Sequence, residues 1–126
     1  MPKISLKPGS KGLVQESGNV VAGEAIGTVA LHTMGGNGET IKTNGALIRR
    51  VDAGGTARTG VIMELGNTDG QLCIVVNTGG ELLTMAAASS SNVTTGTGCK
   101  IATGTGVIFC YDSTIADWHP LYSVDT

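Results

Sequence analysis

The turn at residues 67–70 and the apolar run after it constrain the fold of this chain more than any other feature. The turn reads Asn67-Thr68-Asp69-Gly70, and Asp-Gly between apolar runs favours a tight turn because glycine accepts a positive φ without steric cost. Val61–Leu65 precedes the turn, and Leu72–Val76 follows it without a polar interruption. A short, β-branched run bounded by turn residues is typical of a strand buried on both faces. The centre of the chain is therefore predicted to be β structure.

Short apolar segments between Gly-rich turns continue this pattern, and Asn44-Gly45 is a second tight-turn dipeptide. The fold predicted from this pattern is all-β, a small antiparallel barrel or sandwich of about ten short strands with an extended N-terminal arm. Pro120 has no N–H to donate, which places the last strand at a sheet edge. Besides residues 61–65 and 72–77, strands are expected at residues 12–15, 25–32, 40–42, 46–51, 82–85, 100–102, 107–112 and 118–122. The predicted core comprises Leu72, Ile74, Val76, Val107, Phe109 and Trp118.

The first twelve residues are predicted to be an extended arm, and residues 13–126 a single domain. Lys3, Lys7 and Lys11 give the arm its charge, and Pro2 and Pro8 exclude a regular helix there. One interpretation is a loose chain end. The other is an arm that becomes ordered on a neighbouring acidic surface.

Low charge narrows the possible partners. Charged residues make up 14% of the chain, and the formal net charge of −2 gives no overall attraction to nucleic acid or to an anionic membrane. No segment approaches the run of about 18 apolar residues that a membrane helix needs, and no signal peptide is recognisable. Arg49 and Arg50 lie near Lys42 and Arg58 in sequence, but no aromatic residue is placed beside them to stack on bases. Nucleic acid and membrane are therefore not expected partners.

The three cysteines, Cys73, Cys99 and Cys110, are expected to be reduced and buried, because a free thiol packs as a small apolar group. A Cys73–Cys110 bridge is the alternative, since both residues lie in strongly apolar segments. Residues 86–98 contain almost only Ala, Ser, Thr and Gly. They are interpreted either as a flexible surface loop or as closely packed backbone at a subunit interface.

Catalytic and metal-binding patterns are weak. Asp112, Asp117 and His119 are close in sequence, and residues 117 and 119 share one side of a strand. Two candidate ligands without a third at a recognised spacing do not predict a metal site. The only other histidine is His32, and neither histidine is paired with a nucleophile in a known motif. The chain is predicted not to be an enzyme, and no cofactor is expected.

The second half of the chain resembles a β module of tailed-phage structural proteins, such as head decoration, tail and fibre chains. The resemblance rests on Asp69-Gly70-Gln71, the strand Leu72–Asn77, Leu83–Ala86, the segment Gly106–Asp112 and Trp118. It implies a head decoration (cement) protein that binds the outer surface of the capsid shell and stabilises it. The implied partners are the major capsid protein and further copies of the chain, a trimer before a dimer. The implied location is the virion surface, after assembly in the host cytoplasm.

Within this resemblance, Lys3, Lys7 and Lys11 are the expected capsid contacts. The alternative function is a receptor- or carbohydrate-binding module of a tail or fibre. Such a module needs exposed aromatic rings to stack on sugars, and the chain has one Trp, two Tyr and one Phe.

Overall fold

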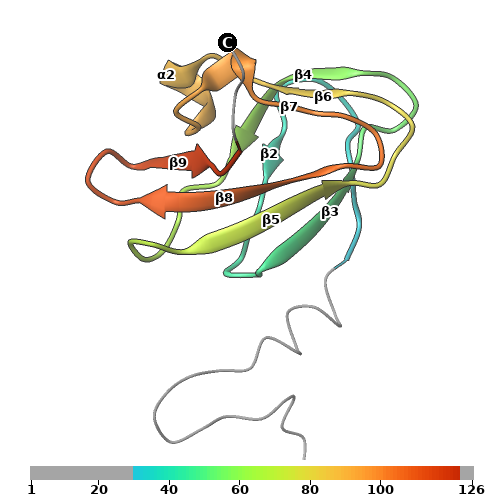
Figure 1. Ribbon diagram of the computed structural model, residues 1–126. Coiled ribbons are helices and arrows are strands. Elements are labelled where there is room, and N and C mark those ends of the chain that lie inside the picture. The colour runs from blue at the N-terminus through green and yellow to red at the C-terminus, as the bar shows by residue number, and fades with distance from the viewer. Residues whose placement is uncertain (1–29, 123–126) are drawn as a thin grey trace, which may run out of the picture.

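The computed structural model describes residues 30–122, and nearly all regular structure in this range is β (Figure 1). The predicted all-β class is confirmed. The predicted N-terminal arm and the strand expected at residues 12–15 lie outside the described residues. No helix among residues 30–122 is long and apolar enough to cross a membrane. The elements are β1 (His32–Thr33), β2 (Thr40–Ile41), β3 (Ile48–Asp52), β4 (Arg58–Met63), β5 (Leu72–Asn77), β6 (Leu83–Met85), α2 (Ala88–Ser91), η1 (Gly96–Gly98), β7 (Lys100–Ile101), β8 (Gly106–Asp112) and β9 (Asp117–Pro120).

The strands form two mixed sheets. One has five strands in the order β1-β3-β5-β8-β9, and the other has four in the order β2-β4-β6-β7. Figure 1 shows β3, β5 and β8 side by side in the layer nearer the viewer. Within residues 30–122, no strand pair joins the two sheets into a closed barrel.

The predicted antiparallel pairing is wrong for more than half of the strand pairs. The pairs β1–β3, β3–β5, β2–β4 and β4–β6 are parallel, whereas β5–β8, β6–β7 and β8–β9 are antiparallel. From β2 to β6 the chain alternates between the sheets, so neighbours in one sheet are two strands apart in sequence and run the same way. Two parallel neighbours need a connection that carries the chain back to the start of the sheet, and here that connection contains a strand of the opposite sheet.

One core lies between the sheets. Alternate side chains of β5 and β8 face it, as the strand period of two requires: Cys73 and Val75 on β5, Val107 and Phe109 on β8. The other buried residues of this core are Met34, Ile41, Val51, Ala53, Val61, Met63, Leu83, Met85, Val93, Cys99, Ile101, Tyr111 and Trp118. Trp118 is fully buried and stacks at a tilt on Tyr111, with the ring centroids 5.0 Å apart. Its indole Nε1 donates to the Glu64 carbonyl oxygen at 2.8 Å, so the only polar group of the ring is satisfied.

The segment of small residues at 86–98 is packed against its own chain and is not a loose loop. It contains α2 and η1, and Ser91, Val93 and Gly96 are buried. Gly96 has φ +52°, and a Cβ on it would lie 2.4 Å from the Ala88 nitrogen, which explains a glycine there. Residues 92–94 pair with Trp118 and so cover part of the free edge of β9. The predicted edge position of Pro120 is confirmed, since β9 ends the five-stranded sheet.

Candidate functional site

The outward side of the five-stranded sheet carries a row of aliphatic side chains. The register pairs Ile48 with Ile74 and Ile74 with Ile108, and the Leu121 nitrogen donates to the Ile108 carbonyl oxygen at 2.7 Å. Residues that are paired across a sheet project to the same face, so these four side chains form a line across four strands or their extensions. Leu72 and Val76, two residues on either side of Ile74, project to this face as well. We call these six residues the outer apolar face.

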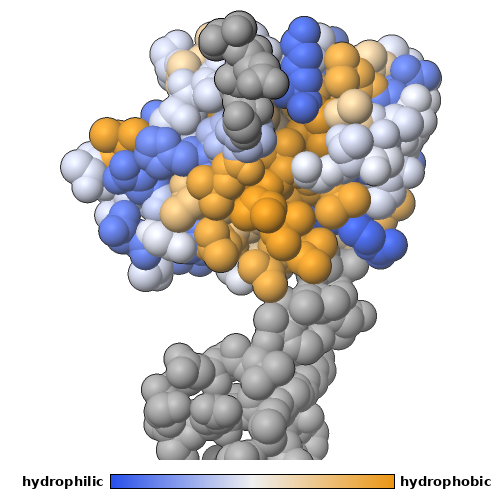
Figure 2. All heavy atoms as spheres, viewed as in Figure 1, coloured by the Kyte–Doolittle hydropathy of each residue, from blue (hydrophilic) through white to orange (hydrophobic). Residues whose placement is uncertain are grey.

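The outer apolar face is substantially open to solvent. Leu72 is 45% exposed, Ile108 42% and Leu121 52%. Figure 2 shows hydrophobic residues gathered on the side of the molecule where β5 and β8 lie in Figure 1. A single exposed leucine is ordinary, but a contiguous apolar patch on a folded domain commonly marks a binding surface.

The burial of side chains in the structure confirms three of the six predicted core residues and contradicts the other three. Phe109 and Trp118 are fully buried and Val107 is 8% exposed, as expected of core residues. In contrast, Leu72 is exposed, and Ile74 and Val76 are half-buried on the outer face. The core-facing residues of β5 are Cys73, Val75 and Asn77. The prediction of two-sided burial was wrong because nothing in residues 30–122 covers the second face of β5, although that face is apolar.

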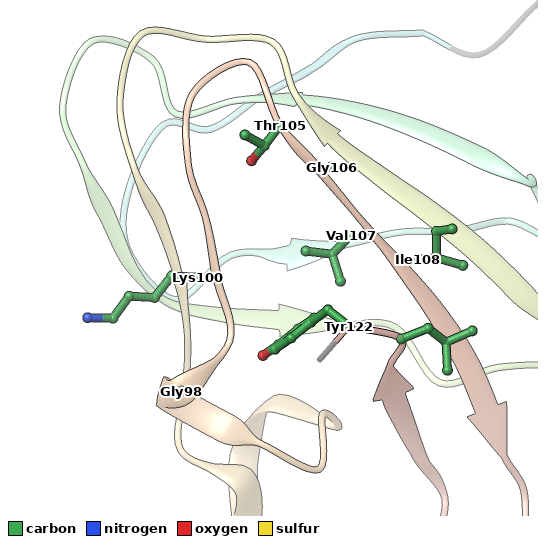
Figure 3. Close-up of a pocket in the computed structure, with 8 residues that line it drawn as sticks. Gly98, Lys100, Thr105, Gly106, Val107, Ile108 and Tyr122 are labelled. Atoms are coloured by element: carbon green, nitrogen blue, oxygen red, sulfur yellow. The ribbon is translucent and has the colours of Figure 1, made fainter. Parts of the chain in front are cut away.

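A hollow of about 370 Å³ opens beside the outer apolar face, between η1 and β7 on one side and β8 on the other (Figure 3). In Figure 3 the Tyr122 ring projects between Gly98 and Val107, and the Lys100 side chain points away from β8. Ile108 and Leu121 belong both to this hollow and to the outer apolar face, so the two surfaces are continuous. The other lining residues are Thr105 and Gly106.

A second hollow, of about 300 Å³, lies at the other end of β8. It is lined by Asp69, Gly70, Cys110, Tyr111, Asp112, Thr114 and His119. His119 Nε2 lies 3.0 Å from Asp112 Oδ2. This hydrogen bond, together with the Thr114 N–H, holds the pKa of the Asp112 carboxyl below its usual value. Asp117 is opposite Asp112 in the register, but among the described residues no three metal-binding side chains gather closely enough to hold an ion.

His32, the other histidine, has an acidic partner in the same way. His32 Nε2 lies 3.2 Å from Glu39 Oε1, and the Gly35 N–H donates to Glu39 Oε2 at 2.7 Å. These contacts hold the pKa of Glu39 below its usual value. The pair fixes the loop between β1 and β2.

The basic residues that are close in sequence do not form one surface. Arg49 and Arg50 are neighbours in β3 and therefore point to opposite faces of the sheet. Arg58 Nε donates to the Ala53 carbonyl oxygen at 2.7 Å and so holds the turn between β3 and β4. Lys3, Lys7 and Lys11, the predicted capsid contacts, lie outside the described residues.

The three cysteines are free thiols, so the predicted reduced state is confirmed. Cys73 and Cys99 are buried as predicted, whereas Cys110 is partly exposed, so the prediction of burial is wrong for that residue. Burial raises the pKa of Cys73 to about 11. Cys73 is opposite Phe109 in the register and faces the core, whereas Cys110 is opposite Leu72 and faces outward. Side chains on opposite faces of one sheet cannot be bridged, which rules out the alternative Cys73–Cys110 bond.

Two polar residues missed by the sequence analysis hold the sheets in place. The Glu64 carboxylate accepts hydrogen bonds from the Thr43 N–H at 2.7 Å and the Asn44 N–H at 3.2 Å, and thereby ties the end of β4 to the turn after β2. Asn77 is fully buried, and its Nδ2 donates to the carbonyl oxygens of Glu81 and Ile101 at 2.7 and 2.9 Å. The sequence contained one signal that could have identified Asn77: it is a polar residue at the end of an otherwise apolar strand.

Comparison with known proteins gives information about the fold alone. No protein-family model matches the chain, and no curated protein matches it. One solved structure, described as a chaperone–substrate complex, aligns with 98% of this chain at a TM-score of 0.55 and 19% sequence identity. The aligned region is 23% of that chain, so the present chain spans about a quarter of its length. At this identity the similarity shows a shared β architecture.

Proposed function

We propose that this chain is a structural protein of a tailed-phage particle, a head decoration protein whose outer apolar face packs against the capsid shell. The observation that carries the proposal is the outer apolar face of the five-stranded sheet, in which three of the six side chains are between 42% and 52% exposed. Apolar area of this kind gains free energy when a second protein surface covers it. In this proposal the chain acts as a homo-oligomer, a trimer before a dimer, so that several copies of the face bind together.

The positions of the aromatic side chains favour decoration over a receptor- or carbohydrate-binding tip. Phe109 and Trp118 are fully buried, and Tyr111 is 6% exposed. Tyr122, at 39%, is the one aromatic residue of the chain that is substantially exposed. A sugar-binding surface uses several exposed rings, whereas a protein–protein surface can rely on aliphatic area.

The hollows do not favour a catalytic alternative. Both are shallow, and the titratable groups that line the second one are partly solvent-exposed. The proposed role therefore rests on surface attachment, with the predicted arm at Lys3, Lys7 and Lys11 as an additional contact.

The test is co-sedimentation of the purified chain with undecorated heads of the virus that encodes it. Ile108→Thr keeps a β-branched residue in β8 but removes apolar area from the centre of the face. Burying the exposed part of this side chain is worth about 1–2 kcal/mol per copy, so bound protein should fall at least several-fold. Ile115→Thr is the matched control, because Ile115 is 50% exposed but lies in the turn between β8 and β9. Equal binding of the two variants would show that this face does not contact the shell.

Light scattering of the purified chain tests the oligomer independently of the shell. A symmetric oligomer is expected in solution or on the particle. A monomer in both settings would contradict this part of the proposal.

A further inference from the structure

The connection between β2 and β3 contains a chemically reactive dipeptide. The sequence has two Asn-Gly pairs, Asn37-Gly38 and Asn44-Gly45. In such a pair the glycine nitrogen can attack the carbon of the asparagine amide, because glycine has no Cβ to hinder the approach. The product is a succinimide ring, which water then opens. Both asparagines are exposed, so exposure does not distinguish the two pairs.

Hydrogen bonds hold both reacting groups of Asn37-Gly38. The Gly38 N–H donates to the Thr59 carbonyl oxygen at 3.0 Å. The Thr59 N–H donates in turn to Asn37 Oδ1, also at 3.0 Å. The nitrogen that would attack and the amide that it would attack are therefore both bound to β4. Neither can move toward the other until these bonds break, which makes the reactive arrangement rare.

The reacting groups of Asn44-Gly45 are not held in this way. Within residues 30–122, neither the Asn44 side chain nor the Gly45 N–H makes a hydrogen bond. The two residues have φ values of 49° and 72°, and the Ala46 N–H donates to the Thr43 carbonyl oxygen at 2.8 Å. Positive φ at both central residues of a four-residue turn is the type I′ conformation.

One rotation of the peptide between Asn44 and Gly45 brings the reacting atoms together. The rotation converts type I′ into type II′, which differs only in ψ of the first central residue and φ of the second. In type II′ the first ψ is about −120°, and at that value the next nitrogen lies on the same side as Cβ. The rotation keeps the Ala46–Thr43 hydrogen bond and the bond from the Asn44 N–H to Glu64. An asparagine is strained in this conformation, so the reactive form is short-lived and the reaction is slow.

We propose that Asn44 is a site of spontaneous deamidation, with water as the co-reactant. The Gly45 nitrogen loses its proton to hydroxide and bonds to Asn44 Cγ. The bond from Cγ to the side-chain nitrogen breaks, and this nitrogen takes a proton from water and leaves as ammonia. Water then opens the succinimide at either of its carbonyl carbons. One water is consumed, one ammonia is released, and residue 44 becomes aspartate or isoaspartate.

The product disturbs the contact that joins this turn to the end of β4. Glu64 Oε2 accepts the Thr43 N–H at 2.7 Å and the Asn44 N–H at 3.2 Å. A carboxylate at residue 44 places a second negative charge within a Debye length of Glu64 and repels it. Isoaspartate also lengthens the main chain by one carbon atom, which a two-residue turn does not accommodate. Deamidation should therefore loosen the turn over time.

The experiment incubates the full-length chain in mildly alkaline buffer, digests samples at acidic pH and maps residues 37 and 44 by mass spectrometry. Asn44 should be converted first. Two hydrogen bonds of ordinary net strength correspond to about a thirtyfold difference in the reactive population, and Asn37 should lag accordingly. In guanidinium chloride these contacts are absent, so the two pairs should react at similar rates. A native Asn44 that is unreactive, or no faster than Asn37, would overturn the proposal.

The effect on the turn is tested separately with Asn44→Asp, which reproduces the aspartate product. This variant should have a lower melting temperature than the unmodified chain at neutral pH. In a Glu64→Gln background the difference should disappear, because the repelling charge is gone. Asn37→Asp is the control of equal charge, and its melting temperature should not depend on Glu64. An unchanged melting temperature for Asn44→Asp, or an equal loss in both backgrounds, would refute the proposed loosening of the turn.

Discussion

The contact between Gly66 and Tyr111 gives the sharpest stability prediction. Gly66 lies in the loop after β4, directly against the face of the Tyr111 ring. A Cβ on Gly66 would lie 2.3 Å from Tyr111 Cγ, 2.5 Å from Cδ2 and 2.8 Å from Cδ1. Carbon atoms in ordinary contact are about 3.5–4.0 Å apart, so the ring of a Gly66→Ala variant has to move by more than about 1 Å. The ring cannot retreat freely, because Trp118 is stacked on it and is itself fully buried.

The size of the effect follows from these contacts. Forcing a methyl group into a packed core costs about 1–3 kcal/mol. Displacing Tyr111 also weakens its tilted contact with Trp118, and such aromatic pairs contribute about 0.5–1.5 kcal/mol. Gly66→Ala should therefore lower the free energy of unfolding by about 2–4 kcal/mol.

Urea unfolding followed by the fluorescence of the single tryptophan measures this change. Gly80→Ala is the matched control, because a Cβ at that position meets nothing within 4 Å, and its effect should stay within about 0.5 kcal/mol. In a Tyr111→Ala background the cost of Gly66→Ala should fall below about 1 kcal/mol, since the clashing ring is gone. If Gly66→Ala matched Gly80→Ala, or kept its full cost without the ring, the contact would not be the cause.

Three further predictions concern buried polarity, acid stability and attachment. Asn77→Leu should destabilise the chain by about 2–3 kcal/mol in urea unfolding, because it leaves the carbonyl oxygens of Glu81 and Ile101 without their donor; an unchanged midpoint would contradict this. The pKa of Glu64 is lowered in the folded chain, first by the Asn44 N–H, so its stabilising contribution is present above the ordinary value of 4.5 and is lost as pH falls below it. The melting temperature of Glu64→Gln should accordingly change less between pH 6 and about pH 3 than that of the unmodified chain. Deleting residues 2–11 should leave the melting temperature nearly unchanged but weaken co-sedimentation with undecorated heads, and equal binding would show that the arm is not a contact.

Local turn signals in the sequence predicted where the chain bends but not which strands pair. Asn44 and Gly45 have φ values of 49° and 72°, and Gly70 has 79°, as the dipeptides indicated. Both turns were expected to join antiparallel neighbours. They instead connect strands of different sheets, since β2 and β4 are in the four-stranded sheet and β3 and β5 in the five-stranded one. Pairing between segments more than 20 residues apart overrides the hairpin preference of the turns.

The apolar run at residues 72–76 marked the right strand but did not indicate which face is covered. Cys73 and Val75 alternate with Leu72, Ile74 and Val76, and both sets are apolar. Hydropathy cannot distinguish a face covered by the chain itself from one left open. The pairing of Cys110 with His119 was equally invisible, because it depends on the register of β8 and β9 and not on spacing along the sequence.

The alternation of consecutive strands between the two sheets also determines how the chain can fold. Among the described strand pairs, β8–β9 is the one closed by a short turn, and every other pair joins segments separated by at least one other element. Neither sheet can assemble alone, because each parallel pair encloses a strand of the other sheet. The entropy of closing long loops is lost before most contacts form, which places refolding in the millisecond-to-second range of β proteins rich in non-local pairs. The β8–β9 hairpin can form first, with Trp118 opposite Tyr111, and the single tryptophan then reports on the earliest structured part of the chain.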